Sequence, residues 1–354
     1  MNVAYVARPS TALPPHKVLT EEILADMAGK LRGHPQLPRF QRIVGNCGVE
    51  SRYFTRPLGA HTLSDAAPVA ERNTAAYQDS LSLALSAASG ALDNAGLAPS
   101  DVDAVVTSHT TSWASPGIDT DLVRHLGLRP EVGRTGMGSL GCAGGAHTLA
   151  KGAAEALNPF LEGSGNVLVV VAETLSTIYN FHEPTLRSTL YNALFGDGAA
   201  AAVVSRSRLT PGMAVERTWE YLLPDSRDRY FGQLTDHGLV FESTPRALRG
   251  TSDVMPALRA WAARGGEELA RPSWSAVHPG GPRILDDVAA GLGLTRQDLD
   301  LSWRSLRECG NLGGVALLHV LGLLHDAPPQ TGEAGVGLAF GPGFTVTALQ
   351  GRWT

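Results

Sequence analysis

Two short glycine-rich segments repeat each other, and this repeat constrains the fold more than any other feature of the sequence. GCAGGAHTL (141–149) and GNLGGVALL (310–318) share the first glycine, the Gly-Gly pair and the closing leucine. If the two segments are copies of one unit, Cys142 and Asn311 hold equivalent positions at the starts of two related helices. Such a duplication brings two polar side chains to the middle of the molecule.

A second pair of segments extends the repeat in the same order. FGDG (195–198) resembles FGPG (340–343), and each precedes a strand-like run. Neither has the spacing of a phosphate-binding loop, so both are predicted to be turns beside strands. The repeat predicts an N-terminal half at residues 1–206, which contains Cys142, and a C-terminal half at residues 207–354.

Helices and strands are predicted to alternate along the whole chain, which favours a layered α/β fold. Apolar residues at helical spacing predict helices at residues 20–31, 73–95, 142–156, 252–263, 282–291 and 312–324. Short apolar or β-branched runs predict strands at residues 103–109, 166–173, 199–206, 274–280, 335–340 and 345–351.

Composition and charge exclude several classes of protein. The 354 residues include 43% hydrophobic and 18% charged residues, which is typical of a globular protein. A net charge of -5 offers no basic surface for nucleic acid, and the apolar runs are shorter than the roughly 20 residues that cross a membrane. The N-terminus lacks the pattern of a secretory signal, so we expect a cytoplasmic protein that binds neither nucleic acid nor membrane.

The three cysteines, Cys47, Cys142 and Cys309, lie far apart without a CxxC pair, so neither a disulfide framework nor a zinc site is predicted. Cys142 differs from the other two because it begins a predicted helix. Unpaired N–H groups and the helix dipole favour thiolate, the nucleophilic form of cysteine, at such a position. The neighbouring glycines leave room for a substrate, although close helix packing through small residues also explains them.

Two further polar residues are candidates for the same site. His278 ends a predicted strand and precedes a Pro-Gly-Gly turn, which is where α/β folds commonly place catalytic residues. Imidazole is also the usual activator of a cysteine. Asn311 is either an ordinary helix N-cap or an amide donor to a developing enolate or oxyanion, and its equivalence to Cys142 favours the second role.

Five motifs occur in a fixed order over nearly the whole chain: LGCAGG, ALFGDGAAA, AVHPGGPRILDDV, ECGNLGGVALL and FGPGFTVTAL. Together they resemble the type III polyketide synthases, the chalcone synthase-like branch of the thiolase-fold condensing enzymes. The resemblance implies a five-layered αβαβα thiolase-like fold built from two pseudo-symmetric halves. It also implies a homodimer in which each subunit has one buried active site that CoA thioesters reach through a tunnel.

The resemblance assigns roles to the residues that match the family's motifs. Cys142 matches the nucleophile that carries the growing chain as a thioester, and His278 and Asn311 match its two partners. Phe195 and Phe241 match the pair of gatekeeper phenylalanines between the tunnel and the cavity.

Four further residues are expected to line the substrate cavity. Tyr191 stands where plant chalcone synthases have a glycine that opens the aromatic starter pocket, so a narrower pocket is expected and a coumaroyl starter is disfavoured. Gly313 replaces a serine that is common in the family, and Pro342 matches the cis-prolyl turn that shapes the cavity floor. Trp113 lies in a loop that is one residue shorter than the plant loop.

Binding of CoA is expected to involve three residues. Arg52 matches a basic residue at the CoA entrance, and Gly280 and Gly281 lie where the CoA arm passes in the family.

The reaction implied by the resemblance condenses an acyl-CoA starter with malonyl-CoA units by decarboxylative Claisen chemistry on Cys142. Cyclisation then gives an aromatic or pyrone product, and no redox cofactor or metal is expected. Two alternatives use the same residue types. One is a condensing enzyme like ketoacyl-ACP synthase III or an acyltransferase, and the other is a cysteine hydrolase of thioesters.

Overall fold

One large sheet organises the molecule in the computed structural model, which describes residues 3–63, 67–182, 184–266 and 271–354. Its strands among these residues are β1 Ala4–Val6, β2 Ser10–Ala12, β5 Ala104–His109, β6 Gly133–Gly138, β7 Asn166–Glu173, β8 Gly198–Ser205, β9 Met213–Leu222, β12 Trp274–Val277, β13 Ala334–Gly341 and β14 Thr345–Trp353. They are ordered β12-β13-β14-β9-β1-β8-β7-β5-β6, and β2 pairs with β8 beside this path.

The two ends of the sheet have the same local topology, as a duplication requires. In the N-terminal part, β5 and β7 are parallel and β7 and β8 are antiparallel. In the C-terminal part, β12 and β13 are parallel and β13 and β14 are antiparallel. Every residue of β7, β8 and β13 is buried, because helices cover both faces of these strands.

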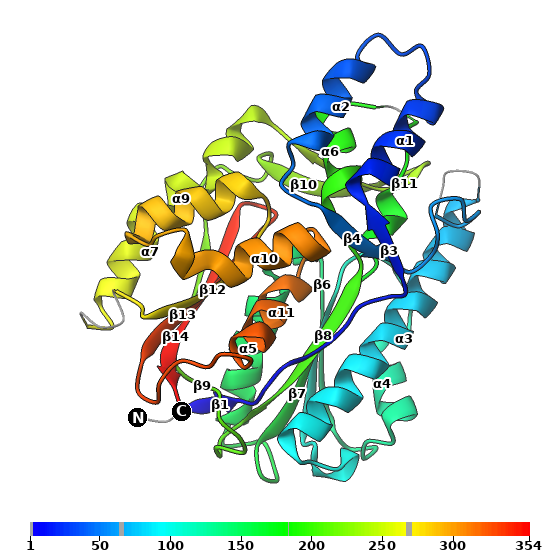
Figure 1. Ribbon diagram of the computed structural model, residues 1–354. Coiled ribbons are helices and arrows are strands. Elements are labelled where there is room, and N and C mark those ends of the chain that lie inside the picture. The colour runs from blue at the N-terminus through cyan, green and yellow to red at the C-terminus, as the bar shows by residue number, and fades with distance from the viewer. Residues whose placement is uncertain (1–2, 64–66, 183, 267–270) are drawn as a thin grey trace.

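The middle layer consists of the two helices that the repeated segments begin, α5 (Gly144–Ala156) and α11 (Val315–Leu324) (Figure 1). A Cβ placed on Gly145 would lie 2.2 Å from the carbonyl oxygen of Gly314, and one on Gly314 would lie 3.4 Å from Cα of Gly144. The repeated Gly-Gly pairs therefore let the two helices touch backbone to backbone.

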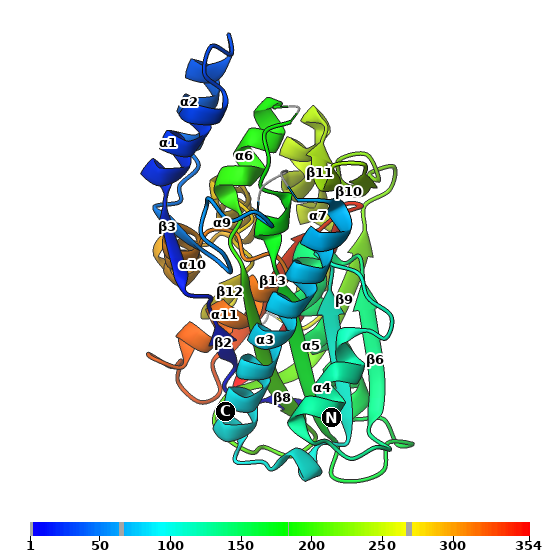
Figure 2. The ribbon, with the colours of Figure 1, turned by 90° about the vertical axis from the view of Figure 1, so that its right-hand side faces the viewer.

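Helices on the outer faces complete a five-layered αβαβα arrangement, as predicted. The N-terminal face carries α3 (Val69–Ala95) and α4 (Ile118–Leu126), seen in front in Figure 2. The alanines of α3 at positions 84, 87, 88 and 91 recur at helical spacing and are completely buried against the sheet. The C-terminal face carries α7 (Gly250–Ala263), α9 (Pro282–Leu292) and α10 (Asp300–Cys309).

Smaller elements gather at one end of the molecule, at the top of Figure 1. They are the helices α1 Thr20–Lys30, α2 Leu37–Gly45 and α6 Leu186–Leu194, the antiparallel pair of β3 His16–Leu19 with β4 Ser51–Phe54, and the hairpin of β10 Tyr230–Thr235 with β11 Gly238–Ser243. Short 3-10 turns lie at Pro99–Asp101, Gly141–Ala143, Leu175–Ile178, Pro245–Arg249 and Gln297–Leu299.

All six predicted helices exist, with small shifts at their ends. The largest shift that concerns the site is at α11, which begins at Val315 and not at residue 312. Helix α5 begins at Gly144 because residues Gly141–Ala143 form a 3-10 turn before it. Arg206, the predicted end of the first half, lies between β8 and β9. Among the described residues, no helix is long and apolar enough to cross a membrane.

Candidate active site

Cys142 lies in the 3-10 turn that precedes α5, at the centre of the five layers. Gly141 begins this turn with φ +51° and donates its N–H to Thr110 Oγ1 at 3.2 Å. The left-handed conformation suits glycine, which has no Cβ to clash. The Cys142 side chain is only 6% exposed, so the turn holds a thiol inside the protein next to the start of a helix.

His278 lies directly after β12 and is held by the neighbouring strand. Its N–H donates to the carbonyl oxygen of Leu338 at 2.8 Å, which continues the pairing of β12 with β13. A Cβ on Gly280 would lie 2.7 Å from Cε1 of the imidazole, so the glycine that follows leaves the ring its space. The side chain is 1% exposed.

Asn311 is fixed by the FGDG segment of the other half. Its N–H donates to the carbonyl oxygen of Leu194 at 2.7 Å, and the N–H of Gly196 donates to its carbonyl oxygen at 3.1 Å. These bonds form an isolated parallel bridge between Phe195 and Asn311. The backbone of Asn311 is therefore bonded on both sides, and its side chain is 3% exposed.

The side-chain amide of Asn311 links the other two candidates. Its Oδ1 accepts from the N–H of Gly313 at 2.9 Å and lies 3.0 Å from Nε2 of His278. Its Nδ2 lies 3.9 Å from Sγ of Cys142. A backbone N–H can only donate, so the bond from Gly313 fixes which end of the amide is oxygen and directs the N–H groups toward the sulfur.

Burial acts strongly on the two titratable members of this set. Desolvation raises the pKa of the Cys142 thiol to about 12, although the hydrogen bond from Asn311 opposes the rise. Desolvation likewise lowers the pKa of His278 to about 4. Burial thus opposes an isolated charge on either group, and it counteracts the thiolate preference predicted from the helix start.

An aromatic wall faces these three residues. Phe195 and Phe241 have ring centroids 5.8 Å apart, and Tyr191 stacks on Phe195 at 5.6 Å. The hydroxyl of Tyr191 donates to Ser243 Oγ at 2.7 Å, which fixes the ring. The same buried cluster contains Cys142, so the predicted gatekeeper phenylalanines and Tyr191 lie beside the sulfur. Tyr191 and Phe241 also line a pocket of about 230 Å³.

Two profiles match the chain at these motifs. The chalcone and stilbene synthase N-terminal domain matches residues 38–207, and the C-terminal domain of the same family matches residues 215–352. The chain belongs to the chalcone and stilbene synthase family. It is a type III polyketide synthase, an acyltransferase that condenses thioesters on an active-site cysteine, and neither the ketoacyl-ACP synthase III-like enzyme nor the thioester hydrolase that the sequence left open.

Relatives and solved structures agree with this assignment. A 1,3,6,8-tetrahydroxynaphthalene synthase from Streptomyces coelicolor is 31% identical over 352 residues, which cover 99% of this chain and 92% of the relative. A phloroglucinol synthase from Pseudomonas fluorescens is 28% identical and 98% of each chain is covered. The crystal structure of the tetrahydroxynaphthalene synthase superposes with a TM-score of 0.93 at 30% identity and covers 99% of both chains. A germicidin synthase from Streptomyces coelicolor gives 0.91 at 30% identity over the full length of both.

The floor of this polyketide synthase site differs from expectation in one detail. Pro342 packs on the cysteine turn, since a Cβ on Gly141 would lie 3.0 Å from its ring. The prediction of a cis peptide bond before Pro342 is wrong, because the cis bonds in the described part of the chain are Ser115–Pro116 and Gly343–Phe344. Gly313, with φ +59°, lies beside Leu175 and supplies the N–H that orients the amide of Asn311.

Two predicted substrate contacts lie elsewhere in the structure. Arg52 is 0% exposed and donates to the carbonyl oxygen of Ala193 and to Thr20 Oγ1, so it supports the core and does not stand at a CoA entrance. Trp113 is 76% exposed on a loop whose backbone is bonded to Asn73, so it does not line the chamber of its own chain. Both corrections depend on how exposed the side chain is in the fold, which the residue type and its neighbours in sequence do not reveal.

The two glycines expected beside the CoA arm lie at the surface, next to the buried imidazole of His278 in the chain. Gly280 and Gly281 are partly exposed and lie between the buried His278 and the start of α9. A path from the surface to the imidazole can therefore run along their backbone, and this role stays a prediction.

Sequence reasoning missed two residues of the site. Glu173, at the end of β7, is 1% exposed, and desolvation raises the pKa of its carboxyl to about 8. Its Oε2 accepts from the N–H of Thr110, which also holds the cysteine turn. Tyr230 stacks on Phe241 at 5.8 Å and meets Tyr191 edge to face at 5.7 Å. A carboxyl that directly follows the apolar run VLVVVA of β7 was the available signal for Glu173.

Proposed function

We propose that Cys142 carries the growing polyketide and that His278 and Asn311 donate hydrogen bonds to the enolate formed when malonyl-CoA loses carbon dioxide. The observation that carries this proposal is the Asn311 amide, which lies between the sulfur and the imidazole with a fixed orientation. Donors that are already in place stabilise a developing charge without reorganising. The enolate carbon then attacks the thioester carbonyl on Cys142, which breaks the bond to sulfur and leaves the lengthened chain on CoA. The chain returns to the Cys142 thiolate by thioester exchange, which releases CoA.

The amide of Asn311 also favours a charge-separated pair over two separate ions. If the thiol proton moves to His278, the amide oxygen faces the imidazolium and the amide N–H groups face the thiolate. Burial penalises each charge alone but penalises adjacent opposite charges much less. We therefore expect Cys142 to react as a thiolate while it is paired with His278.

The starter unit is proposed to be a small acyl group. The locked ring of Tyr191 fills the space beside the sulfur where a bulky aromatic starter would have to lie. The names of the first two relatives, tetrahydroxynaphthalene synthase and phloroglucinol synthase, both denote makers of polyhydroxylated aromatic rings. A polyhydroxylated aromatic product is accordingly proposed for this enzyme, with malonyl-CoA as extender.

The aromatic wall has a second role in this scheme. Phe195 is 2% exposed and Phe241 is 4% exposed, so the space beside Cys142 has dry, apolar sides. An enolate that forms there meets the thioester before it meets water. The thiol, imidazole and amide supply every step, so the expectation that no cofactor or metal takes part is retained.

A homodimer is also proposed. Within the described residues β6 ends the sheet and pairs with β5 alone, which leaves its other edge for a second chain. Trp113, exposed on the nearby loop, is a suitable anchor for such a contact. Light scattering on the purified enzyme should give twice the mass of one chain, and a monomer at all concentrations would contradict the proposal. The use of CoA thioesters supports a cytoplasmic location.

Incubation with malonyl-CoA and a panel of starter CoA esters, with products identified by mass, tests the proposed substrates. We expect a polyhydroxylated aromatic product from malonyl-CoA with a small starter and little conversion of coumaroyl-CoA. Tyr191→Gly is the matched variant, because loss of the ring joins the site to the adjacent pocket and should admit larger starters. Efficient use of coumaroyl-CoA by the unaltered enzyme would contradict the proposed starter.

A further inference from the structure

Strand β4 is bonded to both chain segments that meet at the bridge of Asn311. On one side, the N–H of Glu50, directly before β4, donates to the carbonyl oxygen of Arg307 at 2.8 Å. Ser51 Oγ donates to the carbonyl oxygen of Glu308 at 2.7 Å. Both acceptors belong to the last turn of α10, shortly before Asn311. These bonds fasten the segment that leads into Asn311 to the start of β4.

The other end of β4 is bonded to the opposite segment of the bridge. The N–H of Asp197 donates to the carbonyl oxygen of Tyr53 at 2.8 Å, and the Asp197 carboxyl group accepts from the N–H of Thr55 at 2.8 Å. Asp197 directly follows Gly196, whose N–H donates to Asn311. One short strand therefore fastens both sides of the contact that fixes the asparagine.

Arg52 lies in β4 between these two segments. A Cβ on Gly196 would lie 3.2 Å from Cβ of Arg52, and one on Gly310 would lie 3.3 Å from it. Nη2 of Arg52 donates to Thr20 Oγ1 at 3.0 Å and to the carbonyl oxygen of Ala193. The guanidinium is thus bonded to the chain directly before the residues that bridge to the asparagine.

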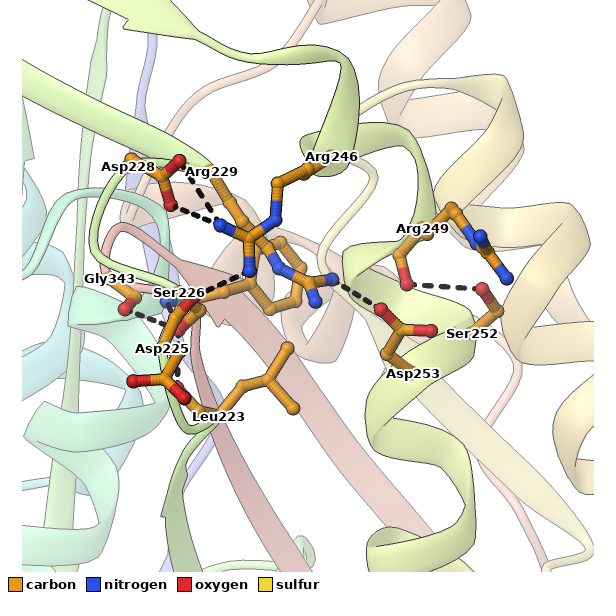
Figure 3. Close-up of polar contacts among 11 residues, drawn as sticks. Leu223, Asp225, Ser226, Asp228, Arg229, Arg246, Arg249, Ser252, Asp253 and Gly343 are labelled. Atoms are coloured by element: carbon orange, nitrogen blue, oxygen red, sulfur yellow. Dashed lines mark hydrogen bonds and ion pairs between the residues drawn. The ribbon is translucent and has the colours of Figure 1, made fainter.

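The charge of Arg52 is buried without a carboxylate bonded to it. The residue is 0% exposed, and neither Nε nor Nη1 has a hydrogen-bond partner in the part of the chain that the structure describes. Arg229, which is also buried, instead pairs with Asp253 of α7 (Figure 3). Burial lowers the pKa of Arg52 to about 10, so the guanidinium keeps its charge at neutral pH. A buried cation without an ion partner is costly unless other groups compensate its charge.

The C-terminal end of α6 provides this compensation. Ala193 and Leu194 are the last two residues of α6, and their carbonyl oxygens accept from Arg52 and from Asn311, respectively. A helix C-terminus carries a partial negative charge, which stabilises a nearby cation. Two neighbouring carbonyl groups of one helix end therefore connect the buried guanidinium with the backbone of the asparagine.

We propose that Arg52 is a positioning residue that fixes the end of α6 and thereby directs the Asn311 amide toward the enolate. Because the carbonyl groups of Ala193 and Leu194 are adjacent, a shift of this helix end moves the backbone of Asn311 with it. The amide then no longer points at the developing charge, and such misplacement slows a reaction strongly. The inference rests on the proposed role of Asn311 as a donor to the enolate.

A double-mutant cycle on the decarboxylation of malonyl-CoA, measured as carbon dioxide release, tests this role. Arg52→Met keeps an unbranched side chain but removes every donor, so it should slow decarboxylation by about tenfold. In an Asn311→Ala background the same change should alter the rate by less than about twofold, because no amide remains to be directed. Arg52→Lys keeps a cationic donor at the end of α6 and should recover most of the lost rate.

Arg129→Met is the matched control. Arg129 also donates to a backbone carbonyl, that of Val102 at 3.0 Å, and it pairs with Asp103. These contacts lie before β5, whereas Thr110, which holds the cysteine turn, follows β5 at its other end. The control should lower the denaturation midpoint and leave the rate of decarboxylation unchanged.

A second variant is used if Arg52→Met does not fold. Thr20→Val removes the hydroxyl that accepts from the guanidinium, and it should slow decarboxylation by about threefold, as expected for one lost hydrogen bond. That loss should likewise disappear in the Asn311→Ala background.

Equal losses in the two backgrounds overturn the proposal, because they show that Arg52 supports the fold or the aromatic wall and not the amide. An unchanged rate in Arg52→Met overturns it as well. If Asn311→Ala alone leaves decarboxylation unchanged, the proposed function fails, so the two failures are distinguished in one assay.

Discussion

The two repeated turns of the molecule are supported in different ways. Asn311 is bonded through its backbone to Leu194 and Gly196, which belong to the opposite half. The turn of Cys142 is supported from the opposite half by close contact with Gly341 and Pro342. In this duplicated architecture, hydrogen bonds therefore hold Asn311 in one direction, whereas Cys142 is held by van der Waals packing.

This difference follows from what each side chain has to do. An amide that stabilises an enolate works only when its N–H points at one oxygen, and hydrogen bonds to its backbone fix that direction. A sulfur that alternately carries and releases a chain needs a fixed place but no single direction. Packing against a tight turn provides that place.

The largest effect is expected when the thiol of Cys142 is removed, because only this turn carries the chain. Cys142→Ala should reduce polyketide formation by at least about 1,000-fold, because no other group can hold the chain. Decarboxylation of malonyl-CoA should persist, because His278 and Asn311 are still present. Product formation and release of carbon dioxide are measured on the same sample, and full condensing activity in this variant would refute the role of Cys142.

A smaller effect is expected at the hydrogen-bonded turn. Asn311→Asp keeps an oxygen for the N–H of Gly313 and for His278 but removes the N–H groups, so decarboxylation and condensation should both slow by ~100-fold. His278→Ala should have a similar effect on both steps. Unchanged decarboxylation in either variant, measured as carbon dioxide release, would show that the residue is not a donor to the enolate.

The packing between the two turns can be tested through stability. Gly145→Ala places a methyl group 2.2 Å from the carbonyl oxygen of Gly314 and should lower the free energy of unfolding by about 2 kcal/mol. Gly29→Ala is the matched control, because Gly29 is an exposed residue of α1 with open space around it. That control should be neutral or slightly stabilising. Equal denaturation midpoints for the two variants would contradict the close contact of α5 and α11.

The last effect is spread over several pH units and concerns Glu173, which lies between the two turns. Its pKa of about 8 is above the ordinary 4.5, so the folded state binds a proton that the unfolded state releases. The free energy of unfolding should therefore decrease as pH rises between these values, by roughly 1.4 kcal/mol per pH unit at most. Glu173→Gln should reduce this slope. Denaturant titrations of both proteins at several pH values check it, and identical slopes would rule out a buried, protonated Glu173.

The catalytic candidates were predictable because their signals are local in the sequence. Cys142, His278 and Asn311 each stand at a glycine-rich junction where a helix begins or a strand ends, and the repeat linked two of them. The Gly-Gly pairs also predicted that α5 and α11 begin close together, as the contact of Gly145 with Gly314 shows.

Residues whose role depends on distant packing were not predictable. Arg52 looks like a surface cation in sequence, but it is buried against Gly196 and Gly310, beside the bridge that holds Asn311. Tyr230 follows an irregular loop without periodicity, so no pattern indicates that its ring packs on Tyr191 and Phe241. The edge strand β6 was missed because its sequence, GRTGMG, is rich in glycine and lacks a strand-like pattern.

The contact between the Gly341–Pro342 turn and the cysteine turn also sets the order in which the enzyme matures during synthesis. A ribosome completes the turn of Cys142 long before it reaches His278, Asn311 or Gly341. The nascent chain thus carries an uncovered thiol with no partner to ionise it. Gly341 and Pro342 cover the turn of Cys142 only when β13 and β14 have joined the sheet.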